Sequence, residues 1–195
     1  MLLRRLDHDV TLHLVRAAED IALWRPGFIA AYLKIFEEPP YLEDYTEAEA
    51  GAVWDYLTRC REHVTLVAAQ GDQVVGFGIA IPLAQTRKVA AALAGLVPDK
   101  HTFYLAEMGI LPAWRGLGLG RVLIRERIKH MDSDRYSHVV LRVPLEGGSS
   151  GELYRALGFE DMGVYMDVEN RRTDGTVRTD RRMFMSRVLS QVDVE

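Results

Sequence analysis

The sequence predicts a mixed α/β domain in which most neighbouring strands run antiparallel. Short β-rich runs alternate along the chain with segments whose apolar residues recur at helical spacing. Two of the β-rich runs, residues 64–69 and 74–81, are separated by Gln70-Gly71-Asp72-Gln73, which suits a tight reversal and predicts a hairpin. A third observation is a strand pattern that leads through a glycine-rich segment into a helix. No repeat or low-complexity linker interrupts the series, so we expect a single domain over residues 1–195.

The N-terminal third is predicted to form one strand and two helices. Residues alternate over 10–15 as in a half-buried strand. Aromatic and aliphatic residues follow helical spacing over 24–36, and this helix must end before the prolines at 39–40, because proline lacks an amide donor. Thr46 and Glu49 have capping-box spacing, which predicts a second helix with a buried stripe of Val53, Trp54, Leu57 and Cys60.

The remaining elements follow from similar patterns. The alanine- and leucine-rich residues 86–97 predict an inserted helix. A strand over 102–110 is expected to precede the glycine-rich segment 111–120, and a helix then runs through Met131. The chain should finish with a strand at 138–143, a helix at 150–157 that ends at Gly158, and a hairpin pairing 164–168 with 177–189 around the turn 173–175.

Composition excludes several classes of partner. Lys and Arg number 24 against 28 Asp and Glu, a net charge of −4, so the chain lacks the basic surface that phosphate-backbone binding needs and we expect no nucleic-acid partner. Cys60 is the single cysteine, which excludes an internal disulfide and a cysteine-based zinc cluster and favours a cytoplasmic location. The charged first ten residues do not resemble a signal peptide, and no apolar run approaches the ~20 residues of a membrane span. None of the six histidines has metal-ligand spacing, so we expect no metal.

The segment from Ile110 to Arg121 carries the main chemical signal. It has glycines at three alternate positions, 116, 118 and 120, directly after a strand and before a helix. Such a loop can bring several backbone amides to one anion, and the helix start adds its positive dipole end, so a phosphate or pyrophosphate is the expected ligand. The segment lacks the Lys-Ser or Lys-Thr of a P-loop, and Arg121 replaces the third glycine of a dinucleotide-binding fingerprint. A tight connection without a ligand is the alternative.

The run from Glu107 to Gly120, EMGILPAWRGLGLG, resembles the acetyl-CoA motif of the GNAT superfamily of N-acetyltransferases. The core of that motif is Arg or Gln, two residues, Gly, one residue, then Gly or Ala, and Arg115, Gly118 and Gly120 fill these places. A second family signature, an aromatic-bearing helix that ends in Gly-Phe, is matched by residues 153–159, and residues 14–20 are similar to the family's first strand and helix. The resemblance covers residues 10–189.

The resemblance implies a fold and a cofactor. The fold is a mixed, mostly antiparallel sheet of six to seven strands flanked by helices, in which the strand from Thr102 parts from the strand near 138 to open a V-shaped slot. The cofactor is acetyl-CoA as acyl donor. The resemblance implies that loop amides from about Leu117 to Val122 hold the pyrophosphate, and that backbone near Ile110 and Leu111 binds the pantetheine arm and faces the thioester carbonyl. The candidate cofactor-binding residues are Ile110, Leu111, Arg115, Gly116, Leu117, Gly118, Leu119, Gly120, Arg121 and Val122.

Acyl transfer from a thioester to an amine needs an uncharged nucleophile and a proton for the departing thiolate. Tyr154 is the candidate acid, because Ser149 and Glu152 have capping-box spacing and a helix that begins there places Tyr154 early, near the mouth of the slot. The alternative is that Tyr154 is an aromatic core residue. Family members often have Asn at the position of Gly147, and Ser149 or Ser150 could replace that contact.

Glu107 is the candidate general base, since it is the one carboxylate in its strand and a Glu on this strand is a common solution in the family. Strict alternation groups Glu107 with Phe103 and Leu105, whereas the family more often places the base in the opposite set with Tyr104. A β-bulge would insert one residue into the alternation and move Glu107 to the opposite set, but the sequence does not show one. Glu107 as the structural partner of a cation remains the alternative, and Tyr104 is the second candidate base.

The acceptor pocket is expected between residues 20 and 62. The loop between the first two helices carries acidic and aromatic side chains that could hold a cationic amine, although an acidic run is more often a solvated face: Glu37, Glu38, Glu43, Asp44, Glu47 and Glu49 among Phe36, Tyr41, Tyr45 and Trp54. The insertion 83–101 could cover the acceptor or simply lengthen a crossover. The leading hypothesis is an N-acetyltransferase that acts on a primary amine of a small molecule or peptide by direct attack in a ternary complex. The alternative is an acyl-CoA-binding sensor without turnover. A homodimer is possible, as in relatives.

Overall fold

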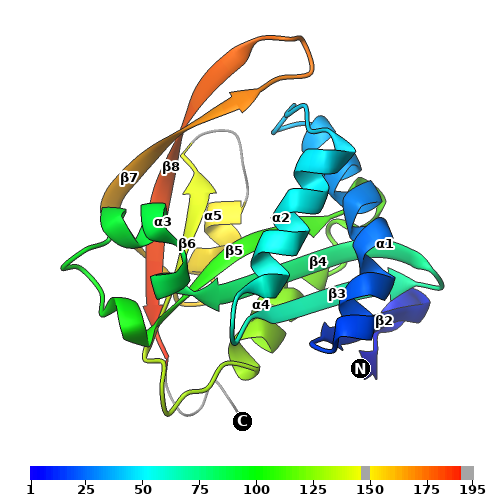
Figure 1. The fold of residues 1–195 in the computed structure, drawn as a ribbon, viewed down its shortest axis with the longest axis horizontal. Coiled ribbons are helices and arrows are strands. Elements are labelled where there is room, and N and C mark those ends of the chain that lie inside the picture. The colour runs from blue at the N-terminus through cyan, green and yellow to red at the C-terminus, as the bar shows by residue number, and fades with distance from the viewer. Residues whose placement is uncertain (146–149, 190–195) are drawn as a thin grey trace.

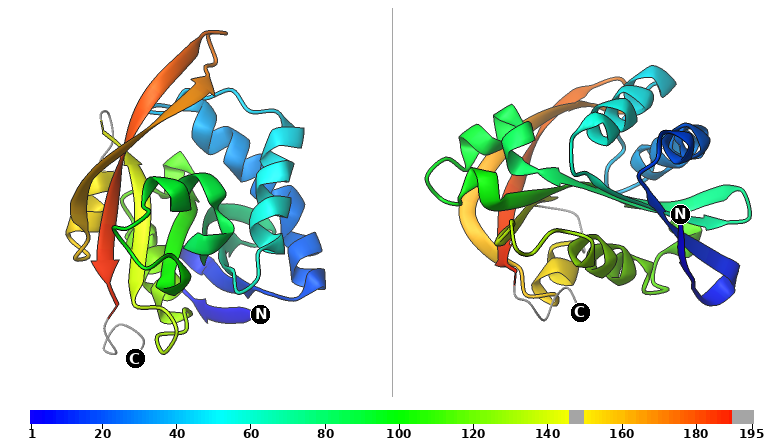
Figure 2. Two further views of the ribbon diagram at one scale, coloured as in Figure 1. Left: turned by 60° about the vertical axis from the view of Figure 1, so that its left-hand side comes forward. Right: turned by 60° about the horizontal axis from the view of Figure 1, so that its bottom comes forward.

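The computed structural model describes residues 1–145 and 150–189, and its described strands form one eight-stranded mixed sheet in the order β1-β2-β3-β4-β5-β6-β8-β7. Helices α1 and α2 cover one face of this sheet, and α4 and α5 cover the other (Figures 1 and 2). The strands are β1 (Leu2–Arg5), β2 (Val10–Val15), β3 (Val64–Gln70), β4 (Gln73–Pro82), β5 (Thr102–Ile110), β6 (His138–Pro144), β7 (Glu160–Arg171) and β8 (Val177–Val188). The helices are α1 (Ala18–Glu37), α2 (Glu47–Arg59), α3 (Arg87–Ala92), α4 (Leu119–Lys129) and α5 (Ser150–Arg155).

The predicted class and the order of the main elements are confirmed, with two differences in detail. The sheet has eight strands where six to seven were expected, because residues 2–5 add an edge strand that pairs with β2. This strand is short and mostly exposed, so its sequence has no alternation of buried and exposed residues. The inserted helix is also shorter than residues 86–97: it ends at Ala92, and Gly95 then adopts a left-handed φ of 79°.

Local chemistry fixes the start of α2, and the aromatic residues of both N-terminal helices anchor them to the sheet. The Thr46 hydroxyl accepts a hydrogen bond from the Glu49 amide at 3.2 Å, and the Glu49 carboxylate accepts one from the Thr46 amide at 2.8 Å, so the predicted capping box is present. Phe28 of α1 packs between Trp54 of α2 and Phe77 of β4, with ring centroids 4.7 and 4.6 Å away. The helices therefore present a rigid surface to one side of the central strands.

The sheet splits between β5 and β6. These parallel strands pair only from Thr102–His138 to Leu105–Leu141. Beyond that point β5 continues to Ile110 along β4, whereas β6 continues to Pro144 along β8. The two strands diverge as they leave the paired region (Figure 1). The predicted V-shaped slot is therefore present, and one edge of β5 is left without a neighbouring strand.

A β-bulge lies in β5 beside the split. Ile79 of β4 pairs with Glu107, but the next residue, Ala80, pairs with Leu105, so Ala106 is an extra residue in β5. Leu105 and Glu107 consequently point to opposite faces of the sheet, although they are two apart in sequence. The bulge places Glu107 on the face covered by α1 and α2, together with Tyr104.

The long β7–β8 hairpin leans toward the loop between α1 and α2 (Figure 1). Backbone groups join the two segments: the Asp44 amide donates to the Arg171 carbonyl at 2.8 Å, and the Thr173 amide donates to the Leu42 carbonyl at 3.0 Å. The hairpin thus forms one wall of the space above the split. None of the helices in the described ranges is long and apolar enough to span a membrane.

Candidate active site

The glycine-rich loop between β5 and α4 has the geometry of an anion site. Gly116 and Gly118 adopt left-handed φ angles of 78° and 79°, a conformation that side-chain-bearing residues rarely adopt. In this part of the described chain, the six successive amides of residues 116–121 have no backbone acceptor: 116–118 precede the helix, and 119–121 are the unpaired first turn of α4. These N–H groups and the positive end of α4 favour a negatively charged ligand.

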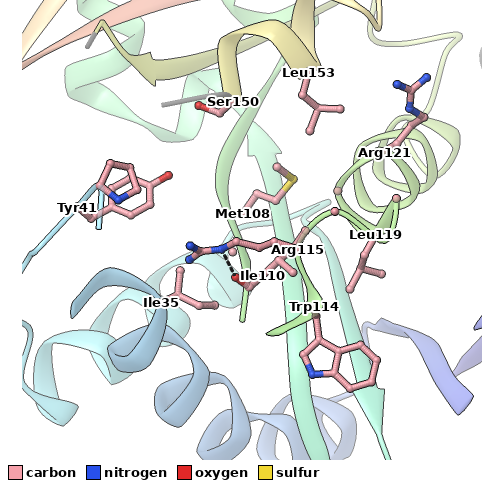
Figure 3. A pocket seen from close by; sticks show the side chains of 15 residues that line it. Ile35, Tyr41, Met108, Ile110, Trp114, Arg115, Leu119, Arg121, Ser150 and Leu153 are labelled. Atoms are coloured by element: carbon pink, nitrogen blue, oxygen red, sulfur yellow. Dashed lines mark hydrogen bonds between the residues drawn. The ribbon is translucent and has the colours of Figure 1, made fainter. Parts of the chain in front are cut away.

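A cavity of about 450 Å³ lies against this loop. Figure 3 shows Met108 at the back of the cavity, between Tyr41 on one side and Leu119 and Arg121 on the other. The Arg115 side chain crosses the floor and donates a hydrogen bond from Nε to the Ile110 carbonyl at 3.1 Å (Figure 3). Of the predicted cofactor-binding residues, the cavity is lined by Ile110, Arg115, Gly116, Gly118, Leu119, Gly120 and Arg121.

Two predicted cofactor-binding residues, Leu111 and Val122, have their amides engaged within the protein, and among the described residues Leu117 keeps an unpaired amide although its side chain points elsewhere. The Leu111 amide already donates to the Val75 carbonyl at 2.9 Å, and the Val122 amide donates to the Gly118 carbonyl at 3.2 Å. These two amides therefore do not face a ligand. The Leu117 side chain lies on the other side of the loop, where it lines a different cavity near β1.

The Leu111 hydrogen bond also shows which amides face the slot. Because the Leu111 amide points to β4, and successive amides along a strand point to opposite edges, the amides of Ile110 and Met108 point to the edge that β6 has left. The expectation of a free backbone N–H in the slot thus fits Ile110, with Met108 as a neighbouring donor.

Tyr154 lies on α5, on the opposite face of β5 from Glu107. Its side chain is buried, its hydroxyl lies 3.9 Å from the Met108 sulfur, and the Arg127 guanidinium is close enough to act on the hydroxyl. Burial raises the pKa of the Tyr154 hydroxyl, and the Arg127 guanidinium opposes this effect because a cation favours the phenolate. Two residues named in the predictions lie outside the described residues. They are Ser149, the predicted cap of this helix, and Gly147, where family members often have Asn.

Glu107 faces a second cavity, of about 160 Å³, which Tyr154 also lines. Because of the bulge at Ala106, Glu107 points to the same face of the sheet as Tyr104. This is the face on which the family more often has its base. Burial raises the pKa of Glu107 to about 7, although the nearby Arg142 guanidinium opposes this. Tyr104 is a poorer candidate because its hydroxyl already accepts a hydrogen bond from Arg142 Nε at 2.8 Å and burial raises its pKa.

Arg127 is a site residue that sequence patterns did not reveal. It lies on the buried side of α4, fully enclosed, and its Nη1 donates to the carbonyls of Ile79 and Glu107 at 3.4 and 3.1 Å. These carbonyls flank the bulge. A Cβ at Gly78 would lie 2.8 Å from Arg127 Nε, so glycine makes room for the guanidinium. The sequence feature that could have revealed Arg127 is its position among Leu123, Ile124 and Ile128, on the core side of the predicted helix.

The acidic loop is engaged with the β7–β8 hairpin. Glu43 is buried, and its Oε1 accepts hydrogen bonds from Arg182 at 2.8 Å and Asn170 at 3.0 Å. Arg171 donates to the carboxylates of Asp44 and Glu49 at 2.8 and 3.0 Å. These three of the six predicted carboxylates therefore bind protein cations and are not free to bind a cationic acceptor.

Three cavities adjoin one another along the split, because neighbouring cavities share lining residues. The cavity at the glycine loop shares Tyr41, Met108 and Ser150 with the cavity that holds Glu107 and Tyr154. That cavity in turn shares its lining with a third, of about 840 Å³, between α2, α3 and β7: the common residues are Tyr104, Ala106, Glu107, Arg142 and Val168. Within residues 1–145 and 150–189 no group of three or more His, Cys, Asp or Glu side chains is arranged to hold a metal.

A split mixed sheet with an amide-lined loop on one side and a carboxylate and a tyrosine at its centre holds the donors and the titratable groups that acyl transfer from a thioester requires. The comparison with known families is more specific. A model described as the acetyltransferase (GNAT) family matches residues 29–159, which is more than half of the chain. The chain therefore belongs to the GNAT acetyltransferase family, whose members use acetyl-CoA as the acyl donor.

Individual relatives agree with this assignment. Over 67 residues the chain is 37% identical to the mycothiol acetyltransferase of Thermobifida fusca (strain YX), a match that covers 34% of this chain and 21% of that protein. The chain thus spans about a fifth of the length of the curated relative it matches. Among solved structures, the ribosomal-protein-alanine N-acetyltransferase from Brucella melitensis has a TM-score of 0.65 and 21% identity, with 91% of this chain and 99% of that chain covered.

A second solved structure holds the cofactor. The structure of Arabidopsis thaliana NAA60 in complex with acetyl-CoA has a TM-score of 0.60 and 13% identity, with 92% of this chain and 98% of that chain covered. At these identities the similarity shows the fold. Together the comparisons confirm the predicted family, fold and acyl donor at the level of the family. The acceptor and the roles of individual residues stay predictions.

Proposed function

We propose that this chain transfers the acetyl group of acetyl-CoA to a primary amine by direct attack in a ternary complex. The observation that carries the proposal is the series of three cavities, in which Glu107 and Tyr154 lie on opposite faces of β5 at the split. A cofactor that enters from the glycine loop and an acceptor that enters from the α2 side would meet between these two side chains. The name of the Brucella structure, an N-acetyltransferase, also supports an amine acceptor.

The cofactor site follows from the loop geometry. The amides of residues 116–121 would bind the pyrophosphate, while Arg115 and Arg121 add positive charge at the wall of the cavity. The pantetheine arm would lie along the open edge of β5. There the Ile110 and Met108 amides can donate to the thioester carbonyl and to the oxyanion that forms on attack, and loss of one such donor typically costs ~10²-fold or more in rate.

The two candidate catalytic residues would supply the proton transfers. Glu107, directly or through a water, takes a proton from the amine as nitrogen attacks the carbonyl carbon and the C–N bond forms. The C–S bond then breaks, and Tyr154 gives its proton to the departing thiolate, so that CoA leaves as the thiol. Arg127 stabilises the resulting phenolate, since its guanidinium lies beside the Tyr154 hydroxyl. Proton exchange with solvent restores both residues.

The central experiment measures release of CoA thiol from acetyl-CoA with a panel of primary amines, in the native chain and in Tyr154→Phe. We expect release that depends on the amine, and a fall of about 10²-fold or more in Tyr154→Phe. Equal rates in the two proteins would remove Tyr154 from the mechanism. Binding of CoA without release for any amine would instead favour the sensor hypothesis.

A second experiment tests the cofactor loop by calorimetric titration with CoA. Gly118→Ala puts a Cβ on a residue with φ of 79°, and the strain should distort the amide loop and weaken binding about tenfold or more. Gly175→Ala is the matched control, because its φ is 80° but it lies in the β7–β8 turn. Equal affinity in both variants would contradict the proposed loop site. The single domain, the cytoplasmic location and the homodimer remain predictions.

A further inference from the structure

The third cavity, of about 840 Å³, is the space in which the acceptor would lie. Apolar residues of α2, β4 and β7 form much of its wall, including Val53, Leu57, Ile81, Met166 and Val168. Its volume is in the range of small-molecule sites. Glu107 stands where this cavity joins the cavity that holds Tyr154. The amine of an acceptor that occupies the space can therefore reach Glu107, while the rest of the molecule contacts the wall.

Arg142 of β6 lines the same cavity and forms no direct ion pair among the described residues, although the charge of Glu107 acts on it from nearby. Its Nε donates to the Tyr104 hydroxyl at 2.8 Å, its Nη1 contacts the Met166 sulfur at 3.0 Å, and its guanidinium carbon lies 5.7 Å from the centre of the Tyr104 ring. All three contacts are neutral. No carboxylate forms an ion pair with Arg142 among the residues that the structure describes, and Nη2 has no hydrogen-bond acceptor there.

Three other arginines near the split are paired with carboxylates. Arg182 pairs with Glu43 at 2.8 Å, Arg171 with Asp44 at 2.8 Å, and Arg181 with Asp167 at 2.9 Å. A half-buried guanidinium that lacks such a partner is costly unless an anion completes the site. Within the described ranges Arg127 also lacks a carboxylate partner, but it is fully enclosed and donates to backbone carbonyls, whereas Arg142 faces the cavity. An anionic group of a ligand in the cavity would therefore complete the contacts of Arg142.

The rest of the lining agrees with an anion. Thr86 is buried, and its hydroxyl has no hydrogen-bond partner within the described ranges. The next two residues, Arg87 and Lys88 of α3, are exposed cations at the rim, and neither forms an ion pair in the described part of the chain. The carboxylates on the wall are Glu107, Glu169 and Asp167, of which Asp167 is bound to Arg181.

We propose that the acceptor is a small primary amine that also carries an oxyanion, a carboxylate or a phosphate, and that Arg142 binds this group with help from Thr86 and the cations of α3. The inference rests on the proposed acetyltransferase function and names the substrate class of that site. The insertion that contains α3 would then form one wall of the acceptor site rather than a mere crossover.

The test compares amines that differ in the anionic group. Phenylalanine and phenethylamine form one pair, and O-phosphoethanolamine and ethanolamine form the other, so the two arms distinguish carboxylate from phosphate. We expect thiol release from acetyl-CoA to have a kcat/KM about tenfold or more higher for the anionic member of at least one pair. In Arg142→Met this preference should vanish through a rise in KM, and Arg142→Lys should restore part of it.

Arg178→Met is the matched control. Arg178 is an exposed arginine of β8 near the turn, where it pairs with Asp174 at 3.4 Å, and it does not line the cavity. This variant should keep the preference of the native chain. Because loss of Arg142 also removes a cation that lowers the pKa of Glu107, both rates are compared only as a ratio: Arg142→Met should lower kcat/KM for the anionic amine about tenfold or more relative to its neutral partner. A purely structural role of Arg142 would lower both members of a pair equally and leave the ratio unchanged.

A binding arm separates failure of this inference from failure of the proposed function. The CoA-saturated protein is titrated calorimetrically with phenylalanine and with O-phosphoethanolamine. Heat with the native chain that is lost in Arg142→Met supports the inference even if no amine is acetylated. Absence of heat with both probes, or acetylation that prefers neutral amines, would overturn it. Failure of the proposed function would instead appear as absence of CoA binding, or as CoA binding without thiol release for any amine.

Discussion

Glu107 shows how burial and charge set the behaviour of one carboxylate. Its pKa of about 7 reflects burial, which disfavours the ionised form, and the cation Arg142, which restores part of it. Such a value suits a general base near neutral pH, since the group is then both ionised in a useful fraction and basic enough to take a proton.

Glu107→Gln is expected to remove the base. In the native chain kcat should rise with pH until about pH 7 and then level, because only the ionised carboxylate accepts a proton. In the glutamine variant kcat should fall by about 10²- to 10⁴-fold, and the rise toward pH 7 should disappear. The measurement is a pH profile of thiol release at saturating acceptor. An unchanged profile would assign Glu107 a structural role.

The same shift in pKa predicts a dependence of stability on pH. The pKa is raised from an ordinary value of 4.5 to about 7 on folding, so between these values the folded state binds more protons than the unfolded state. The free energy of unfolding should therefore fall as pH rises from about 4.5 to 7. Denaturation at pH 5 and pH 8 tests this: relative to the native chain, Glu107→Gln should be more stable at pH 8 than at pH 5.

Arg127 connects the two candidate catalytic residues through the bulge. Arg127→Met should leave the buried carbonyls of Ile79 and Glu107 without their donor, at a cost of about 1–3 kcal/mol per group. The melting temperature and kcat should fall together. Arg125→Met, an exposed position on the same helix, is the control and should change neither. Equal melting temperatures and rates for the two variants would show that the bulge does not depend on Arg127.

At the scale of elements, the β7–β8 hairpin holds the loop between α1 and α2 by a buried ion pair. Glu43 is 3% exposed and Arg182 15%, and burial raises the pKa of Glu43 although Arg182 opposes this. The hairpin thus sets the position of Tyr41, which lines both the cofactor cavity and the reaction cavity.

Breaking this pair should cost far more than breaking an exposed one. Arg182→Met leaves the Glu43 carboxylate buried without its cation, for which we expect about 3–5 kcal/mol of lost stability. Arg178→Met breaks an exposed pair on the same strand and should change stability little, because solvent screens such pairs. Denaturant titration measures both. Similar losses would mean that the Glu43 carboxylate finds water or another donor, and that the hairpin is not held by this contact.

Elements with local chemical signals could be predicted from the sequence. The capping box at Thr46, the reversal at residues 70–73 and the glycine loop depend on residues close in the chain. The bulge at Ala106 could not, since the carbonyls beside it accept hydrogen bonds from Arg127, which lies 21 residues further along the chain. The partners of the acidic loop were missed for the same reason, because the arginines that bind it lie more than 120 residues away.

At the scale of the whole molecule, CoA would contact both sides of the split, from the α4 loop to α5. A ligand of the folded state at 100 times its dissociation constant adds ~2.7 kcal/mol to stability. For a chain of this size the melting temperature should rise by about 5–10 °C. Thermal unfolding with and without CoA tests this, and Gly118→Ala should reduce the rise whereas Gly175→Ala should not. The same shift in both variants would place the nucleotide outside the loop.

Because pairing between β5 and β6 ends at Leu105–Leu141, the sheet has an edge with unpaired backbone groups in its interior. Exposed edge strands at the outside of a sheet can pair with strands of other chains, which leads to aggregation. Here helices cover both faces of the sheet beside the split, so the open edge of β5 lies inside the molecule and not at its outer border. The protein can thus keep unpaired backbone donors and acceptors available to a ligand without exposing a strand edge that promotes aggregation.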